Sequence, residues 1–583
     1  MAEKMENAIR MAFGKSSFWA LLALAAGAQA EIAVQFTIDL SKDNRLISPL
    51  IYGSNTDELT AADGITFRRS GGNRMTGYNW ENNASHAGTD WQNSSDNFMG
   101  GGNVPGKAIT DFHDKSIADG QQSLITLQAA GYVAKDKKGT VSEADAAPSA
   151  RWAKVVFEKG SAFAATPDTN DANVYMDEFV AFMKGKYGAA DAANGVKRWS
   201  VDNEPALWPF THPRIHKDTT LAAELVEKTA ALATAVKKID PQSEIFGGVF
   251  YGYMEYHSMQ NAPDWNTVNA GNKYGWYIDY FLDAMKKASD QAGKRLLDVL
   301  DLHWYPEAAG DNRITDAGAT TAKDRAARLQ APRSLWDNTY TENSWIVQMR
   351  PGPINLLNRV QASIDKYYPG TRISITEYNY GEGAHVTGGL AEADFLGVMA
   401  MKGVYASNFW PLSEKAVYVA SAFRLYRNYD GQKGTYGKAA ASAVSSDKAT
   451  ASVFASFNPG GDEVHIVAIN KSPTETVKGT FAVASPVALA AAVKAYGFDQ
   501  SATAVSAKAE GAVAEGAFTY ALPPWSATHF VLKTTGTLPS VGLRPALIRP
   551  GARTSAPAYL PDGRLFAPGA GRKAPAVPLL RGN

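Results

Sequence analysis

Eight short runs of β-branched or alternating apolar residues recur through residue 411, and helical segments separate most of them. The strand-like runs are residues 50–54, 65–69, 123–127, 196–202, 245–249, 297–304, 372–377 and 407–411. Segments with apolar residues at helical spacing span residues 174–187, 221–239, 276–292, 354–367 and 390–404. Strands that alternate with helices form parallel sheets, and eight such units close into a barrel. We therefore predict an α/β fold, a TIM-like (β/α)8 barrel, over residues 50–426.

The composition and the apolar pattern of the sequence change after Tyr426. Short runs rich in Ala and Val at residues 451–457, 463–470 and 476–483 are separated by Pro-Gly-Gly and Lys-Ser-Pro turn signals. This pattern is typical of an all-β sandwich, which we place at residues 427–535. Residues 31–39 are also strand-like and precede the barrel, so we expect the segment 31–49 to add a strand to the sandwich.

Both ends of the chain differ from the domains between them. Lys4, Arg10 and Lys15 precede an apolar run at residues 18–26 and the small-x-small sequence Ala28-Gln-Ala30, which predicts a secretory signal peptide over residues 1–30. The alternative is a membrane anchor, but the apolar run is well short of the ~20 residues that a span needs. Residues 536–583 are basic and rich in Pro, Gly and Ala, which predicts a disordered tail that is either a solvated linker or a sorting or attachment signal.

The charges balance, because Lys+Arg and Asp+Glu both total 58. A net charge of zero provides no field that would attract nucleic acid or an anionic membrane, so we expect a neutral substrate and no nucleic-acid partner. Cysteine is absent, so the exported fold depends on burial alone. We expect a secreted, extracellular or cell-surface protein that spans no membrane after signal removal and acts as a monomer.

Two glutamates stand at the ends of predicted barrel strands. Glu204 lies in Asp202-Asn-Glu-Pro205 after the fourth strand, and Glu377 lies in Thr376-Glu-Tyr378 at the end of the seventh. Barrel active sites form at the carboxyl ends of the strands, so both side chains should enter one cleft. Hydrolysis of a glycosidic bond needs a carboxylic acid on one side of the anomeric carbon and a carboxylate on the other. The pair therefore predicts a glycosidase.

Four longer motifs make a family resemblance specific. They are Arg69-Ser-Gly-Gly-Asn-Arg-Met-Thr-Gly-Tyr-Asn-Trp80, Trp199-Ser-Val-Asp-Asn-Glu-Pro-Ala-Leu-Trp208 with its continuation to His216, Asp301-Leu-His-Trp-Tyr-Pro306, and Ile375-Thr-Glu-Tyr-Asn-Tyr380. Over residues 31 to 535 the chain resembles glycoside hydrolase family 44, whose members are retaining endo-β-1,4-glucanases, often active on xyloglucan. The resemblance implies that Glu204 is the acid/base and Glu377 the nucleophile.

The neighbours of the two glutamates acquire roles by position. Asn203 is expected to hydrogen-bond the sugar 2-hydroxyl, and Arg69 to keep Glu377 ionised through its opposite charge. A capping role for Asn203 and a different acidic partner for Arg69 are the alternatives. Asn79, His303 and Tyr378 are further predicted substrate contacts, and no His/Cys cluster suggests a catalytic metal or other cofactor.

Aromatic residues reach 11% of the chain, and a polysaccharide needs several aromatic platforms in a row. Aromatic side chains near strand ends on the predicted active face, each either core or platform, are Trp80, Trp208, Trp304, Tyr305, Trp336, Trp345 and Trp410. Trp80, Trp336 and Trp410 are favoured as platforms because they lie in or beside polar, Gly-rich or Asn-rich segments.

A structural calcium is the one metal that the sequence suggests. Asp168 and Asp171 lie close together in Pro167-Asp-Thr-Asn-Asp171, and Glu58 is expected to complete the site. The alternative for the two aspartates is a loop that caps the following helix.

The leading interpretation is a secreted retaining endo-β-1,4-glucanase that acts on cellulose-like chains or xyloglucan. The same chemistry on mannan or xylan is the nearest alternative, since paired glutamates on barrels serve many polysaccharides. A carbohydrate-binding protein without chemistry is the alternative from another class.

Overall fold

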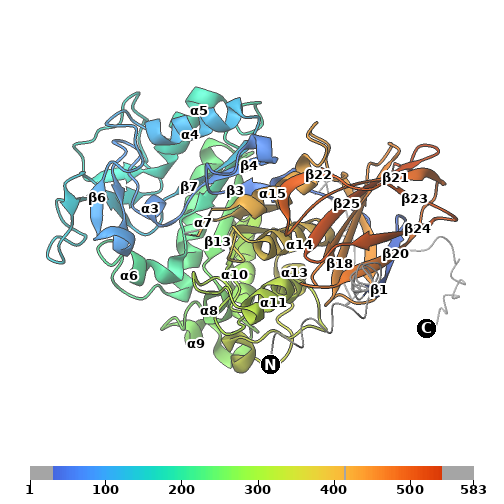
Figure 1. Ribbon diagram of the computed structural model, residues 1–583. Helices are drawn as coiled ribbons and strands as arrows, with labels where there is room; N and C mark the ends of the chain where they lie inside the picture. The colour runs from blue at the N-terminus through green and yellow to red at the C-terminus, as the bar shows by residue number, and fades with distance from the viewer. Residues whose placement is uncertain (1–30, 413–414, 541–583) are drawn as a thin grey trace, which may run out of the picture.

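A closed parallel barrel forms the first part of the protein (Figure 1). The computed structural model describes residues 31–412 and 415–540. In chain order the barrel strands are β3 (Gly53–Ser54), β4 (Phe67–Ser70), β7 (Gln122–Leu127), β12 (Arg198–Val201), β13 (Glu244–Phe250), β14 (Val299–Trp304), β15 (Arg372–Tyr378) and β16 (Ala406–Phe409). Each predicted strand run overlaps one of these strands, so the predicted barrel is confirmed.

Helices cover the outside of this barrel. They are α4 (Lys107–Ala118), α5 (Met176–Tyr187), α7 (Ala222–Ile239), α10 (Tyr277–Ala292), α13 (Leu356–Tyr367), α14 (Val386–Lys402) and α15 (Val417–Arg427). In α13 the buried residues Leu357, Val360 and Ile364 follow helical spacing, which places them on one face. Between β3 and β4 the connection holds only the short 3-10 helix η2 (Ala61–Asp63).

The loops that follow β4 and β7 are long and carry small sheets of their own. One sheet has the order β5–β6–β9 and the other the order β11–β10–β8. The bounds of these strands are β5 (Ser85–His86), β6 (Ser94–Asp96), β8 (Tyr132–Ala134), β9 (Gly139–Thr140), β10 (Trp152–Val156) and β11 (Asn173–Tyr175). Short segments in the connections between these elements are α3 (Asn73–Thr76), η3 (Gly88–Trp91), η4 (Pro205–Leu207), α6 (Trp208–Thr211), α8 (Tyr253–Ser258), α11 (Ala322–Gln330), η6 (Ala331–Leu335) and α12 (Trp345–Met349).

The second part of the protein is a β-sandwich. Its strands are β1 (Glu31–Asp39), β2 (Arg45–Leu46), β17 (Ala439–Ser445), β18 (Ala451–Phe457), β19 (Glu463–Asn470), β20 (Thr476–Ala484), β21 (Leu489–Asp499), β22 (Ala502–Ala507), β23 (Gly511–Ala512), β24 (Ala517–Leu522) and β25 (Ser526–Thr534). Strand β1 pairs antiparallel with β17 and parallel with β20, so the first strand of the described chain completes the sandwich. The rings of Phe36, Phe481, Phe518 and Phe530 meet in its core.

Helix α14 joins the two parts. Nearly all of its residues are buried, because the barrel covers one side and the sandwich the other (Figure 1). Phe454 of β18 packs directly against Gly397, where a Cβ would stand 2.3 Å from the phenyl ring. The buried ion pair between Lys471 and Asp394, 2.6 Å, crosses the same boundary.

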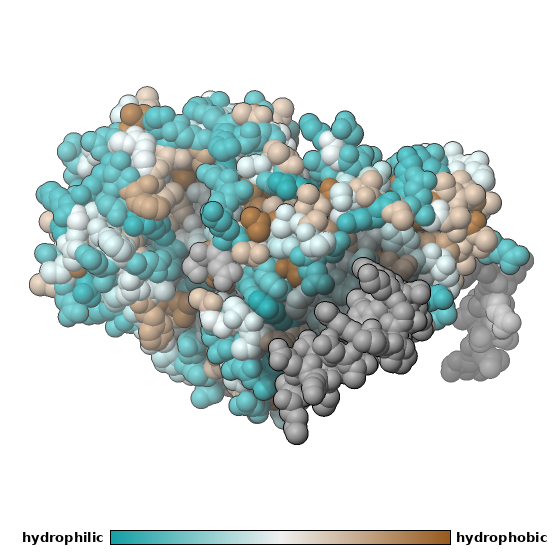
Figure 2. Space-filling view, viewed as in Figure 1, coloured by the Kyte–Doolittle hydropathy of each residue, from teal (hydrophilic) through white to brown (hydrophobic). Residues whose placement is uncertain are grey.

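Among the described residues, no helix has both the length and the apolar character that a membrane crossing requires. Figure 2 shows a mostly hydrophilic face with scattered apolar patches, the ordinary surface of a globular protein. The predicted signal peptide, residues 1–30, lies outside the described residues. So do residues 541–583 of the predicted basic tail.

Candidate active site

The structure brings Glu204 and Glu377 together at the carboxyl ends of β12 and β15. His303 of β14 lies between them, and one ligand atom from each of the three side chains falls within 4.8 Å of the others. His303 Nδ1 is 2.8 Å from Glu204 Oε1 and 3.5 Å from Glu377 Oε2. His303 and Glu377 are register partners on adjacent strands, so the barrel itself sets this spacing.

The backbone before Glu204 turns sharply out of the strand. Asp202 and Glu204 both have positive φ angles, 55° and 45°, which non-glycine residues rarely adopt. The fully buried Asp202 carboxylate fixes this turn, since it accepts hydrogen bonds from Thr76 Oγ1 and from the backbone N–H groups of Ala129, Ala130 and Asn203. Strain held by such a network is characteristic of functional turns.

Glu377 is held by two donors. Arg69 Nη1 donates to Oε1 at 2.7 Å, and the Tyr305 hydroxyl donates to Oε2 at 2.9 Å. Arg69 Nη2 also donates to Asn203 Oδ1 at 2.8 Å, and Asn203 in turn donates to Asn73 Oδ1 at 3.2 Å. The Arg69–Glu377 pair expected from the sequence is present, with the Glu377 side chain only 6% exposed.

The two glutamates have different electrostatic surroundings. Burial raises the pKa of Glu204 to about 7, although the Arg69 charge opposes the shift. Burial also lowers the pKa of His303 to about 4, so its imidazole is neutral at pH 7. The pKa of Tyr305 is raised well above its usual value, first by burial and then by the charge of Glu377, so its hydroxyl remains a donor. Glu204 is therefore suited to donate a proton.

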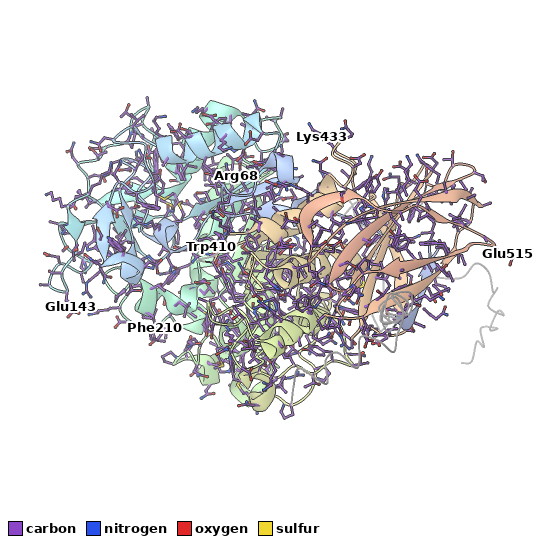
Figure 3. All side chains as sticks on the ribbon, viewed as in Figure 1. Arg68, Glu143, Phe210, Trp410, Lys433 and Glu515 are labelled. Atoms are coloured by element: carbon purple, nitrogen blue, oxygen red, sulfur yellow. The ribbon has the colours of Figure 1, made fainter. Side chains whose placement is uncertain are left out.

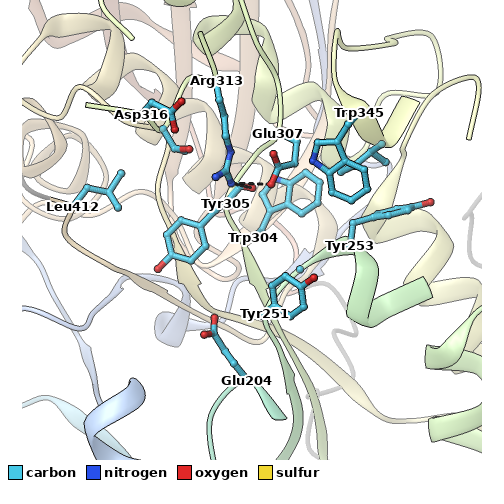
Figure 4. A pocket seen from close by; sticks show the side chains of 13 residues that line it. Glu204, Tyr251, Tyr253, Trp304, Tyr305, Glu307, Arg313, Asp316, Trp345 and Leu412 are labelled. Carbon is cyan, nitrogen blue, oxygen red and sulfur yellow. Dashed lines mark hydrogen bonds and ion pairs between the residues drawn. The ribbon is translucent and has the colours of Figure 1, made fainter. Parts of the chain in front are cut away.

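A cavity of about 330 Å³ opens beside Glu204 (Figure 4). Its lining residues include Tyr251, Tyr253, Trp304, Tyr305, Glu307, Arg313, Asp316 and Trp345. Figure 4 shows the Glu204 carboxyl at one end of the cavity and the Trp345 ring at the other. Aromatic walls with a few placed polar groups are typical of a ligand-binding site.

Several sequence-predicted residues thus lie at the site, namely Arg69, Asn203, His303, Trp304 and Tyr305. Trp410 is half-buried, and its ring covers Gly72, where a Cβ would stand 2.5 Å from Cη2. Gly72 follows β4 within three residues of Arg69, so Trp410 remains a predicted platform near the catalytic pair.

The predicted platforms Trp80, Trp208 and Trp336 are wrong. Trp80 is buried against Phe179 and Phe182 of α5. Trp208 is fully buried, and its Nε1 donates to the Asn203 carbonyl. Trp336 packs beside Lys402, at the end of α14 that points away from the active face, and Lys448 of the sandwich.

The predicted contacts Asn79 and Tyr378 are also wrong, because both side chains are buried in the interior. The Asn79 amide donates to the Ala134 carbonyl at 3.0 Å. The Tyr378 ring stacks on Phe395, and its hydroxyl donates to Glu392 at 2.7 Å. Tyr378 follows Glu377 in a strand, so its side chain points to the opposite side, away from the cleft.

The predicted calcium ligands do not assemble as a set. Within the described part of the chain, the one group of His, Asp and Glu side chains with metal-ligand spacing is Glu204, His303 and Glu377. Glu58 lies in the exposed loop after β3. The acidic neighbour of Asp168 and Asp171 is Glu81, whose pKa is raised to about 8 by burial and then by nearby carboxylates. The prediction of Glu58 as a ligand is therefore wrong, and a structural calcium stays untested.

Sequence reasoning missed other parts of the site. Tyr251 and Tyr253 follow β13 directly, and their place at a strand end was a usable signal. Trp345, which the sequence named as core or platform but did not favour, is 38% exposed and lines the cavity, whereas the favoured tryptophans do not. Glu255 accepts hydrogen bonds from the backbone N–H groups of Ala206 and Tyr251, a contact between separate loops that no local pattern reveals.

Two carboxyl groups lie this close at the carboxyl ends of barrel strands, and burial raises the pKa of one of them so that it can act as an acid. This arrangement defines a glycoside hydrolase. The model of glycoside hydrolase family 44 matches residues 84–308 of the chain. Endoglucanase A of Paenibacillus lautus is 47% identical over 517 residues, which cover 87% of this chain and 73% of that protein.

Solved structures of family 44 enzymes are similar to this chain in sequence and in fold. The xyloglucanase of Paenibacillus polymyxa, a family 44 enzyme, is 46% identical, with 86% of this chain and 100% of that chain covered and a TM-score of 0.84. Cel44A, a family 44 endoglucanase from Clostridium thermocellum, shows the same identity and coverage with a TM-score of 0.83. The chain belongs to glycoside hydrolase family 44.

Proposed function

We propose that this glycoside hydrolase is a secreted, retaining endo-β-1,4-glucanase that cleaves cellulose-like β-glucans and xyloglucan. The relatives named above are called endoglucanases and a xyloglucanase, and the Paenibacillus polymyxa enzyme has been solved with xyloglucan. The aromatic cavity and the zero net charge suit an uncharged polysaccharide. Secretion rests on the signal-like sequence of residues 1–30.

The distance between the two carboxyl groups is the observation that supports a retaining mechanism. Their nearest ligand atoms lie within 4.8 Å, whereas inverting enzymes keep the groups about 6.5–9.5 Å apart so that a water molecule fits between them. Retaining enzymes need only about 5–5.5 Å, because the carboxylate itself attacks the sugar. This distance supports Glu377 as nucleophile and Glu204 as acid/base.

In the first step, protonated Glu204 donates its proton to the glycosidic oxygen while a Glu377 oxygen bonds to the anomeric carbon and the leaving chain departs. Arg69 and Tyr305 hold Glu377 in position for this attack. The glycosyl ester removes the negative charge from Glu377, which favours the ionised form of Glu204. Glu204 then takes a proton from water, whose oxygen attacks the anomeric carbon and releases Glu377.

His303 assists Glu204 in both steps. Its neutral imidazole places Nδ1 at hydrogen-bond distance from Glu204 Oε1, where it accepts from the carboxylic acid in one tautomer and donates to the carboxylate in the other. The accepting tautomer therefore supports Glu204 as the acid in the first step, and the donating tautomer supports it as the base in the second.

Cleavage of mannan or xylan by the same residues is the alternative substrate class. A protein that only binds polysaccharide is less consistent with the site, because binding alone requires neither a carboxyl group with raised pKa nor a second one beside it.

The test measures viscosity loss and reducing ends on β-glucan, xyloglucan, mannan and xylan with purified protein. Wild-type protein should lower the viscosity of a β-glucan or xyloglucan before many reducing ends appear. Glu204→Gln and Glu377→Gln should each reduce the rate by at least about 1,000-fold without altering thermal unfolding. Full activity in either variant would exclude its assigned role.

A further inference from the structure

Two large aromatic side chains stand exposed on the active face outside the catalytic cavity. Trp91 in η3 is 61% exposed and Phe210 in α6 is 60% exposed. Figure 3 places Phe210 at the periphery of the barrel and Trp410 nearer the centre of the molecule. Removing such apolar area from water favours any ligand that covers it.

The two aromatics belong to one rigid unit. The Thr89 hydroxyl donates to the Phe210 carbonyl at 3.3 Å. Gly88 has a φ of 57°, and a Cβ there would stand 2.0 Å from the Thr211 carbonyl oxygen, so only glycine allows η3 to pack this closely on α6. A pre-formed surface loses little conformational entropy when a ligand binds.

A chain of polar contacts connects this unit to the catalytic pair. Asn73 Nδ2 donates to both carboxylate oxygens of Asp90, at 3.2 and 3.0 Å, and Asn73 Oδ1 accepts from Asn203. Asn203 precedes Glu204, and Trp91 follows Asp90. The aromatic unit is therefore continuous with the site.

The barrel order places the unit on the other side of Glu204 from the cavity. Strand β12, which leads to Glu204, lies between β13 and β7. The cavity is lined from the ends of β13 and β14, whereas Trp91 follows β4, the neighbour of β7. A chain long enough to occupy both regions crosses Glu204.

We propose that Trp91 and Phe210 form an outer sugar-binding subsite for the part of a neutral β-glucan chain that extends beyond the catalytic centre. The proposal rests on the proposed function. Aromatic rings offer the flat apolar area on which the C–H faces of pyranose rings stack, and the exposed polar side chains of Thr89, Asp90 and Gln92 surround them with hydrogen-bonding groups. Two side chains are too small an area for a stable protein partner, which needs about 800 Å² on each side.

The experiment measures oligosaccharide binding by calorimetry in the inactive Glu204→Gln background. Affinity is compared for a tetrasaccharide and an octasaccharide of the β-glucan series. Trp91→Ala and Phe210→Ala should each reduce the affinity gained on going from the shorter to the longer sugar by about fivefold. Trp91→Tyr, which keeps an aromatic plane, should retain most of it.

Val444→Ala, at an exposed apolar position on the sandwich strand β17, is the matched control and should keep the full length preference. An unchanged length preference in both alanine variants would overturn the subsite. Failure of the proposed function is a separate result, because it requires wild-type protein that hydrolyses no β-glucan or xyloglucan.

Discussion

At the residue scale, Glu204 and Glu377 carry the same side chain in different surroundings. The Glu377 carboxyl group accepts hydrogen bonds from the Arg69 guanidinium and the Tyr305 hydroxyl. Among the described residues, the side chain at hydrogen-bond distance from the Glu204 carboxyl group is the neutral His303. Burial therefore decides the pKa of Glu204, which is raised to about 7. The fold thus gives Glu204 the surroundings of an acid and Glu377 those of a nucleophile.

The raised pKa predicts the alkaline side of the activity profile. Glu204 must carry its proton to act as acid, so kcat/KM should be high below pH 7 and fall as pH rises through the pKa of about 7. The measurement is kcat/KM against pH on a soluble β-glucan. A rate that stays constant well above pH 7 would contradict the assignment of Glu204 as the acid.

The sequence allowed the prediction of catalytic-site residues that stand at the ends of barrel strands. It did not allow the prediction of which aromatic side chains are buried. Arg69, Glu204 and Glu377 were predictable because barrel strands present their last residues to one cleft. Trp80 and Trp345 both lie among polar neighbours in the sequence, yet α5 covers Trp80, whereas Trp345 has only the edge contact with Tyr253 among the recorded ring contacts of the described residues and stays 38% exposed. Which helix packs on which indole depends on tertiary structure that local pattern does not encode.

At the scale of elements, one buried carboxyl group links two active-site loops. Glu255 in α8 accepts from Ala206 N–H, two residues after Glu204, and from Tyr251 N–H at the cavity wall. Burial raises its pKa well above the usual range. The side chain positions the Glu204 turn relative to the end of β13.

Replacing Glu255 should disturb catalysis without removing a reacting group. In Glu255→Gln the amide NH2 would face one of the two backbone N–H groups, so the loops should separate slightly. We expect kcat to fall about 10- to 100-fold with little change in KM, and stability to fall by about 2 kcal/mol. Kinetics and thermal unfolding measure both effects.

Glu143→Gln is the control, since Glu143 is exposed. Wild-type kcat in the Glu255 variant would show that this carboxyl group does not position the turn.

Element boundaries were predictable except where packing overrides local preference. Helix α14 begins at Val386, four residues before its predicted start. The glycines at 388 and 389 disfavour a helix locally. Here they permit close contact, because a Cβ would stand 2.3 Å from the Glu382 carbonyl oxygen at Gly388 and 2.6 Å from that of Tyr418 in α15 at Gly389.

At the scale of the whole molecule, a buried histidine pair joins the sandwich to the last barrel helix. His529 Nδ1 lies 2.7 Å from the Leu425 carbonyl of α15, so this nitrogen carries the proton. Its bare Nε2 then accepts from His465 Nδ1 at 3.1 Å. Burial lowers the pKa of both rings to about 3, so both are neutral in the folded protein.

This pair predicts loss of stability in acid. Unfolded histidine titrates near about pH 6.5, so below that pH the unfolded chain binds protons that the folded pair does not. The contribution of the pair is complete above about pH 6.5 and declines as pH falls toward 3. Thermal unfolding of wild type and His465→Asn across this range should show a weaker pH dependence in the variant. An identical pH dependence would contradict the account.

The central claim is double displacement by Glu204 and Glu377, and the configuration of the first product tests it most directly. NMR of the sugar released in the first minutes, before the anomers equilibrate, distinguishes the two outcomes. A newly formed reducing end in the β configuration is the predicted result, because two successive inversions restore the original stereochemistry. An α product would contradict the assignment of Glu377 as a nucleophile.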